Sequence, residues 1–273
     1  MWRFEEQRSR SGIAYCRRGQ GPAVMLLHGI PGSGTSWAAT VGLLPHSVDV
    51  VVPNLLGFGA SARPSAIDDL HAAAQAEALA DLIDELGLES LTVVGHDFGG
   101  PVAIALSSIR REHVAALGLL ATNVFPDTPI PFPLSMARLP VVAGWAQRVL
   151  FSSASLRVML RQGTGPGASP PDPTTYLGGR GQQRSIATIF AGSLTRLEEL
   201  YQPIESQLQG LTCPTFVGWG DQDPFFSVSQ GQRTAEAART ALRLYPSAGH
   251  FLPHERPAEV AAAILELTSA VPH

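Results

Sequence analysis

The chain has 273 residues with 45% hydrophobic content, which suits a single α/β domain or such a core with an insertion. A formal net charge of −4 leaves no basic excess of the kind that marks nucleic-acid-binding proteins. No apolar run approaches the length of a membrane span, and the first residues lack a signal-peptide pattern, so we expect a cytoplasmic protein.

Strands and helices are predicted to alternate along most of the chain. Short apolar or β-branched runs predict strands at 12–16, 23–27, 48–52, 91–94, 114–120, 215–218 and 242–245. Helical spacing of apolar residues predicts helices at 66–86, 102–109 and 258–267, and a helix that contains 235–238. This alternation is typical of an α/β fold with a mostly parallel central sheet flanked by helices.

The alternation stops between Asn123 and about Leu211. Prolines are frequent at the start of this region, and helical patterns follow at 141–151, 156–160 and 185–200, around a Gly/Pro/Ser-rich loop at 163–173. We therefore expect a core formed by residues 1–123 and 212–273, with residues 124–211 inserted as a helical cap, or lid.

The predicted strand at 23–27 ends in the turn His28-Gly29-Ile30-Pro31-Gly32. The N–H of Ile30 in such a turn can point into a site at the edge of the sheet and stabilise an oxyanion. The alternative is an ordinary turn built from glycine and proline.

The most informative motif, Gly95-His96-Asp97-Phe98-Gly99-Gly100, lies between the strand at 91–94 and the helix at 102–109. A strand, a sharp turn and a helix form the layout of the nucleophile elbow, G-x-S-x-G, here with Asp97 in the serine position. A carboxylate in that position attacks an alkyl carbon and leaves an alkyl-enzyme ester, whereas a serine forms an acyl-enzyme. The N–H of Phe98 is a second candidate oxyanion donor. The alternative is an ordinary turn whose Asp caps the helix.

Two later turns supply the other candidate catalytic groups. Asp223 follows the strand at 215–218, and Pro224 fixes its turn, so we predict that Asp223 orients an imidazole. Asp221 is better explained as a turn former, and Asp127 is the nearby competitor. His250 follows the last predicted strand and is expected to activate water. Nucleophile, acid and histidine then follow one another along the chain at positions 97, 223 and 250.

Together these segments resemble the α/β-hydrolase superfamily, in the branch that holds epoxide hydrolases and haloalkane dehalogenases. The matching motifs run nearly end to end: HG-x-P at 28–31, GFGAS at 57–61, GHDFGG at 95–100, GDQDP at 220–224 and AGHF at 248–251. The resemblance implies the α/β-hydrolase fold with a cap. It also implies a two-step hydrolysis without a cofactor, in which an ester forms on Asp97 and water activated by His250 cleaves it.

The chain departs from parts of this branch. Haloalkane dehalogenases usually hold the halide with a Trp after the nucleophile and often with an Asn after HG, where this chain has Phe98 and Ile30. Phe98 also replaces the basic residue usual in haloacetate dehalogenases. Epoxide hydrolases tolerate Phe there and use cap donors, usually two tyrosines. We therefore expect epoxide hydrolysis to a vicinal diol. The alternatives are a carbon–halogen hydrolase acting on haloalkanes or haloacids, another hydrolase or lyase, and a non-catalytic small-molecule receptor.

The substrate pocket is expected to be mainly apolar and covered by the cap. The candidate substrate contacts are Trp145, Tyr176, Tyr201, Phe251 and, at the rim, His28. Cys16 and Cys213 are interpreted as buried thiols, and no Cys/His cluster has metal-ligand spacing. We expect a small-molecule substrate, no metal, no cofactor, no nucleic-acid or membrane partner, and a monomer or homodimer.

Overall fold

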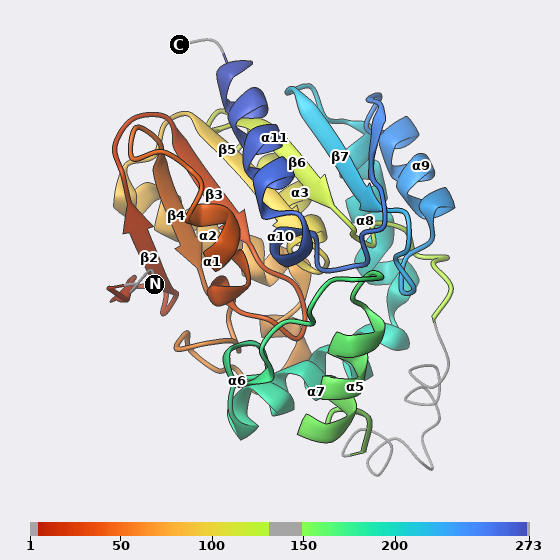
Figure 1. Ribbon diagram of the computed structural model, residues 1–273. Helices are drawn as coiled ribbons and strands as arrows, with labels where there is room; N and C mark the ends of the chain where they lie inside the picture. Colours follow the sequence, from red (N-terminus) through yellow and green to blue (C-terminus); the bar gives the residue numbers. More distant parts are fainter. Residues whose placement is uncertain (1–4, 131–148, 272–273) are drawn as a thin grey trace.

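The computed structural model describes residues 5–130 and 149–271, and it is organised around an eight-stranded sheet (Figure 1). The strands are β1 (Gln7–Arg8), β2 (Ala14–Arg18), β3 (Ala23–Leu27), β4 (Asp49–Pro53), β5 (Leu91–His96), β6 (Val114–Leu120), β7 (Thr215–Gly220) and β8 (Leu242–Tyr245). Their order in the sheet is β1-β2-β4-β3-β5-β6-β7-β8. The β1–β2 and β2–β4 pairs are antiparallel and the others are parallel, which confirms the expected mostly parallel sheet.

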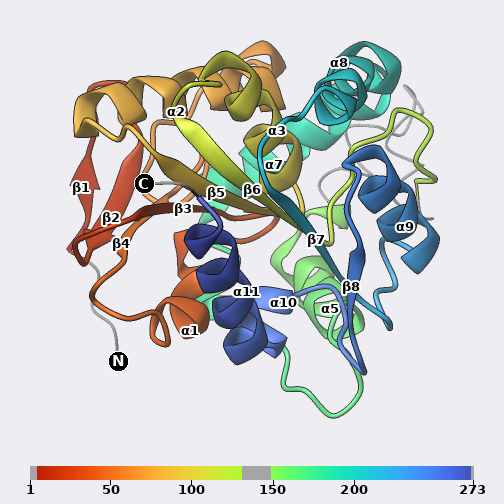
Figure 2. The ribbon, with the colours of Figure 1, turned by 90° about the horizontal axis from the view of Figure 1, so that it is seen from above.

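Helices cover both faces of this sheet (Figure 2). One face carries α2 (Ala72–Leu86), α3 (Gly99–Ile109) and α8 (Leu197–Gln209), and the other carries α1 (Ala38–Val41) and α11 (Pro257–Ser269). Helix α9 (Val228–Ala237) packs on β7 and α8, and the short α10 (Leu252–Glu255) precedes α11. Two 3-10 helices lie at Gly34–Trp37 and Ile67–Asp69.

Alternate residues of the central strands enter two different hydrophobic cores. In β3, Met25 and Leu27 belong to the core under α2 and α3, whereas Val24 and Leu26 belong to the core under α1 and α11. Successive side chains of a strand point to opposite faces, so a strand buried on both faces must be apolar throughout. This requirement explains the continuous apolar run of β3, all of whose residues are buried.

The helix predicted at 66–86 begins only at Ala72. His71 has an extended backbone, and its side chain accepts a hydrogen bond from the N–H of Ala74 at 3.4 Å, so it caps the first turn. At the other end Gly87 has a left-handed φ of +63°, the conformation in which glycine ends helices. Strand β1 and helices α1 and α10 were not predicted, because two to four residues are too few to show a periodic pattern.

Three further helices lie at the carboxyl ends of the parallel strands (Figure 1). They are α5 (Ser153–Gln162), α6 (Pro173–Tyr176) and α7 (Arg180–Leu194). The helical pattern predicted at 185–200 is two helices, α7 and α8, separated at Thr195 and Arg196. Most of the pattern predicted at 141–151 lies outside the described residues. The limits of the cap at 124–211 stay a prediction.

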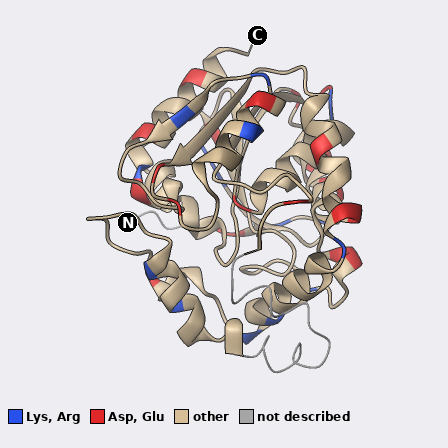
Figure 3. Ribbon diagram, turned by 90° about the vertical axis from the view of Figure 1, so that its right-hand side faces the viewer, with Lys and Arg blue, Asp and Glu red and all other residues tan. Residues whose placement is uncertain are grey.

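Charged side chains are distributed unevenly over these layers (Figure 3). Basic residues predominate on the lower helices of Figure 3, since α5 and α7 carry arginines and no acidic residue. The acidic residues lie mainly on the helices that flank the sheet. Within 5–130 and 149–271, no helix is both long and apolar enough to cross a membrane.

Candidate active site

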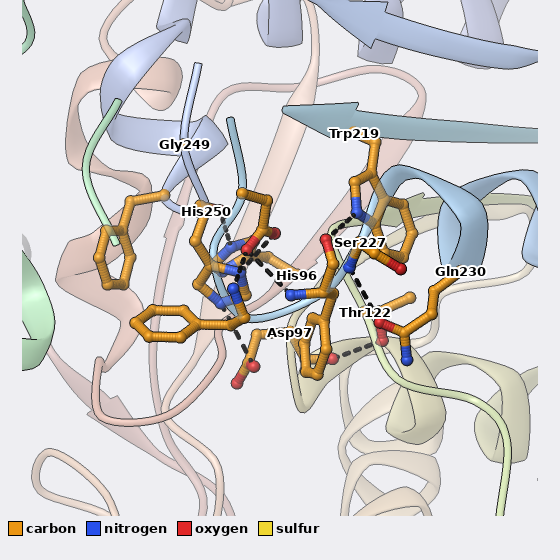
Figure 4. Close-up of polar contacts among 12 residues, drawn as sticks. His96, Asp97, Thr122, Trp219, Ser227, Gln230, Gly249 and His250 are labelled. Atoms are coloured by element: carbon orange, nitrogen blue, oxygen red, sulfur yellow. Dashed lines mark hydrogen bonds and ion pairs between the residues drawn. The ribbon is translucent and has the colours of Figure 1, made fainter. Parts of the chain in front are cut away.

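Asp97 lies in the tight turn between β5 and α3, at the carboxyl edge of the sheet. Its φ of +53° is a strained conformation for a residue with a side chain. The turn is held by its backbone, because the Asp97 N–H donates to the Leu120 carbonyl at 3.1 Å and the Thr122 hydroxyl donates to the Asp97 carbonyl at 2.6 Å (Figure 4). Gly95 must be a glycine because the turn is tight: a Cβ there would lie 2.2 Å from the Gly99 carbonyl oxygen.

The two carboxylate oxygens of Asp97 have different partners. Oδ1 accepts the N–H of Ile30 at 2.7 Å, from the turn that follows β3, while Oδ2 lies 3.4 Å from Nε2 of His250. Burial alone would raise the pKa of Asp97, but His250 and the Ile30 N–H hold it below its usual value. Asp97 is therefore ionised at neutral pH, with one oxygen fixed by a backbone donor. The Phe98 ring lines the neighbouring cavity, and the role of its N–H as a second donor stays a prediction.

His250 follows β8 and is held between two carboxylates. Its Nδ1 donates to Oδ2 of Asp223 at 2.9 Å, and Oδ1 of Asp223 accepts the N–H groups of Phe225 and Phe226 at 2.8 and 3.1 Å. Burial would lower the pKa of His250, yet the charges and hydrogen bonds of Asp223 and Asp97 raise it to about 10. At neutral pH the imidazole is thus protonated and paired with both acids.

Aromatic rings surround the imidazole of His250. The rings of Phe225, Phe226 and Phe251 meet it edge to face, with centroids 5.1, 5.4 and 5.2 Å away. On another side, Nε2 of His96 donates to the His250 carbonyl at 2.8 Å (Figure 4). These contacts exclude water from most of the ring and strengthen its interactions with the two carboxylates.

A cavity of about 140 Å³ opens above Asp97 and His250. Its walls are mainly apolar, and the described residues that line it are Ile30, Asp97, Phe98, Pro101, Asn123, Thr128, Pro129, Ile130, Met159, Ile189, Phe190, Ser193, Leu194, Leu197, Tyr201, Phe225, Phe226 and His250. The volume is below the range of drug-sized ligand sites, so it suits a small apolar molecule.

Tyr201, on α8, is a candidate substrate contact that the structure places at the cavity. Burial raises the pKa of its hydroxyl, as does the charge of Asp97, while the Asn123 side chain opposes the rise. Oδ1 of Asn123 accepts from the Phe125 N–H and from the Thr128 hydroxyl, so its amide nitrogen remains for other partners. Tyr201 therefore keeps its proton at neutral pH and can donate it in a hydrogen bond.

Other expected substrate contacts lie elsewhere. His28 is fully buried behind the site, where Nε2 accepts the Leu55 N–H at 3.0 Å and Nδ1 donates to the Gly29 carbonyl, so the prediction that it contacts substrate needs correction. Tyr176 and Phe251 pack edge to face on each other, with centroids 5.8 Å apart, and neither is among the lining residues. Trp145 lies outside the described residues.

Sequence reasoning missed most of the cavity wall. Phe225 and Phe226 directly follow the Asp223-Pro224 turn, and this closeness to a predicted site residue could have identified them from the sequence. The wall supplied by α7 had no motif to reveal it. Within the described parts of the chain, no group of three or more His, Cys, Asp or Glu side chains is arranged to hold a metal ion.

Comparisons with known proteins show which family and fold the chain has. A family model for the alpha/beta hydrolase fold matches residues 22–257. The chain is 27% identical to haloalkane dehalogenase 2 of Mycobacterium tuberculosis, covering 94% of this chain and 92% of the relative. It is 26% identical to epoxide hydrolase A of the same organism, covering 92% and 91%. A solved structure of a thermophilic esterase from Thermogutta terrifontis, with malate bound, has a TM-score of 0.79 at 26% identity and covers 97% of both chains.

Proposed function

The chain belongs to the alpha/beta hydrolase fold family, and from this premise we propose that it hydrolyses small, mainly apolar epoxides through an ester on Asp97. The observation that carries the proposal is that the two carboxylate oxygens of Asp97 have different partners. The Ile30 N–H binds Oδ1 at 2.7 Å, and Oδ2 lies on the side of His250. One oxygen is thus held as the future carbonyl oxygen of an ester, and the other is left to attack.

In the first step Oδ2 of Asp97 attacks an epoxide carbon. A bond forms between that carbon and Oδ2, the carbon–oxygen bond of the ring breaks, and its electron pair stays on the epoxide oxygen as an alkoxide. Esterification removes the negative charge of Asp97, so the pKa of His250 falls from about 10. The imidazolium can then give its Nε2 proton to the alkoxide, which becomes the first hydroxyl group.

In the second step the neutral imidazole acts as general base. His250 takes a proton from water, and the hydroxide attacks the ester carbonyl carbon, whose oxygen the Ile30 N–H stabilises as it becomes an oxyanion. The tetrahedral intermediate collapses, the alcohol oxygen leaves with the proton from His250, and a diol departs. Asp223 keeps Nδ1 as the protonated nitrogen throughout, so that Nε2 is available as the base.

The polar groups of the cavity support an oxygen leaving group. Tyr201 lines the cavity and keeps its hydroxyl proton, so it can donate to the opening epoxide oxygen. The side chains of Phe98 and Ile30 cannot donate a hydrogen bond to a halide. Carbon–halogen hydrolysis is the second candidate, because a relative is named haloalkane dehalogenase 2 and the Asn123 amide lines the cavity.

The test is a turnover panel of small epoxides, haloalkanes and carboxylic esters, read for diol, halide and acid. We expect diol as the main product. One turnover in heavy-oxygen water should place the label in the Asp97 carboxylate and leave the first diol unlabelled, because water attacks the ester carbonyl. Label found only in the product would contradict the covalent mechanism. Binding without turnover across the whole panel would favour a small-molecule receptor.

A further inference from the structure

Glu255 is a buried carboxylate that takes no part in the proposed chemical steps. It ends α10 and is 9% exposed. Its Oε2 accepts the N–H groups of Gly165 and Gly249 at 2.7 and 2.9 Å, and its Oε1 accepts the N–H of Phe251 at 2.9 Å. Gly249 and Phe251 are the two chain neighbours of His250, so one side chain binds the backbone on both sides of the imidazole.

The charge of Glu255 has no cation to balance it among the described residues, since no Lys, Arg or His forms an ion pair with it. Three backbone N–H groups compensate the burial instead. A glutamine could not satisfy the same three donors, because its amide has one acceptor oxygen and places an NH2 group against the remaining N–H.

The same carboxylate connects the His250 loop to the segment that follows α5. Gly165 lies in that segment, and the His250 N–H donates to the Gly163 carbonyl at 2.7 Å. The two loops meet at glycines, since a Cβ at Gly249 would lie 2.3 Å from the Gly163 carbonyl oxygen. Glu255 thus holds two backbone segments together at the point where the helices above the cavity join the catalytic edge.

We propose that Glu255 is a positioning residue for His250, which keeps the imidazole between Asp223 and Asp97 by fixing the N–H groups of Gly249 and Phe251. The proposal rests on the proposed function in so far as His250 activates water. Displacing the imidazole affects the step in which water must lie in line with both Nε2 and the ester carbon. In ester formation the imidazolium only gives its Nε2 proton to an alkoxide that has already formed, so the attack of Asp97 does not need this alignment.

The test compares Glu255→Gln with Glu259→Gln, a matched change at an exposed residue of α11. We expect Glu255→Gln to slow cleavage of the Asp97 ester by about ten- to a hundredfold while ester formation is unchanged, because a small misplacement of a catalytic group costs that much. Amide hydrogen exchange of Gly249 and Phe251 should become faster in Glu255→Gln. Glu259→Gln should behave as wild type in both measurements.

Other results would overturn the proposal. A merely structural role predicts that Glu255→Gln lowers the melting temperature and slows both steps equally, or neither. If Glu255→Gln fails to fold, the rates of ester cleavage and ester formation are compared in Glu255→Asp instead, and their ratio decides. If the ester on Asp97 never forms in any variant, the proposed function fails, and amide exchange at Gly249 and Phe251 then decides alone: unchanged exchange overturns the positioning role, and faster exchange supports it.

Discussion

Nε2 of His250 lies 3.4 Å from Oδ2 of Asp97, on the side of the carboxylate that the Ile30 N–H leaves free. The charge of one group therefore sets the protonation state of the other. An imidazole with a pKa of about 10 is a poor base at neutral pH, yet the ester removes the partner that keeps it protonated. In the proposed mechanism, formation of the ester on Asp97 thus converts His250 into the base that the second step requires.

This coupling predicts the behaviour of Asp97→Asn. The substitution keeps the shape of the side chain and removes its charge, so the pKa of His250 should fall below the wild-type value of about 10. Asp223 should keep part of the elevation. NMR titration of the His250 imidazole measures the change. An unchanged pKa would mean that Asp97 does not hold the proton on His250.

The pH dependence of ester cleavage follows from the same argument. In the proposed mechanism the neutral imidazole is the base, so the rate of ester decay should fall as the pH decreases through the pKa of His250 in the intermediate. That pKa should lie below the value of about 10 in the free enzyme, because Asp97 is then uncharged. Rapid mixing at different pH values, after the ester has formed, provides the measurement. An inflection at or above the free-enzyme value would contradict the prediction.

His250→Gln should stop the reaction at the ester. Asp97 attacks without help from a base, but water is no longer activated, so an adduct with the mass of the substrate should accumulate on the protein. Intact-mass spectrometry detects it, and Asp97→Ala is the control that should show no adduct. Normal turnover by unmodified His250→Gln would remove His250 from the mechanism.

Asp223→Asn should slow ester cleavage by about 10³–10⁴-fold. Oδ1 of the new side chain can still accept from the Phe225 and Phe226 N–H groups, which places its NH2 group against Nδ1 of His250. The imidazole must then carry its proton on Nε2, so Nε2 can no longer accept a proton from water. Nitrogen NMR of His250 should show the altered tautomer, and single-turnover kinetics should show a slow second step. A wild-type rate of decay would show that Asp223 does not orient the base.

The sequence predicts best the residues whose position depends on where a strand ends. Asp97, Asp223 and His250 each come shortly after a strand of the parallel part of the sheet, and parallel strands place their carboxyl ends along one edge. The structure brings these three together, while their catalytic roles stay predictions. The cavity wall was harder to predict from the sequence, because α7 contributes Ile189 and Phe190 through packing that no local motif records.

The placement of His28 and Tyr176 also had no signal in the sequence. His28 is part of the HG-x-P motif and Tyr176 packs against Phe251 of the AGHF motif, but the direction of a side chain decides whether it faces the cavity or the layer behind it. His28 satisfies both ring nitrogens with backbone groups, and Tyr176 packs against Phe251. Such choices depend on tertiary packing rather than on spacing along the chain.

Tyr201→Phe distinguishes the two leading chemistries. Opening an epoxide develops negative charge on oxygen, and a tyrosine hydroxyl at the cavity stabilises that charge in the transition state. The substitution should reduce epoxide turnover by about ten- to a thousandfold with little change in the Michaelis constant. Steady-state kinetics on epoxides gives this ratio, and adduct formation under single turnover shows that ester formation is the slowed step.

Tyr176→Phe is the matched comparison, because it removes the same hydroxyl from a tyrosine that does not line the cavity. Its epoxide turnover should stay within about twofold of wild type, the size of change expected away from the reacting atoms. A halide leaves as a diffuse anion that gains less from one hydroxyl, so Tyr201→Phe should affect haloalkanes much less than epoxides. If Tyr201→Phe leaves epoxide turnover unchanged, the electrophilic assistance assigned to Tyr201 is wrong. If halide release then exceeds diol formation across the panel, carbon–halogen hydrolysis replaces epoxide hydrolysis as the function of this site.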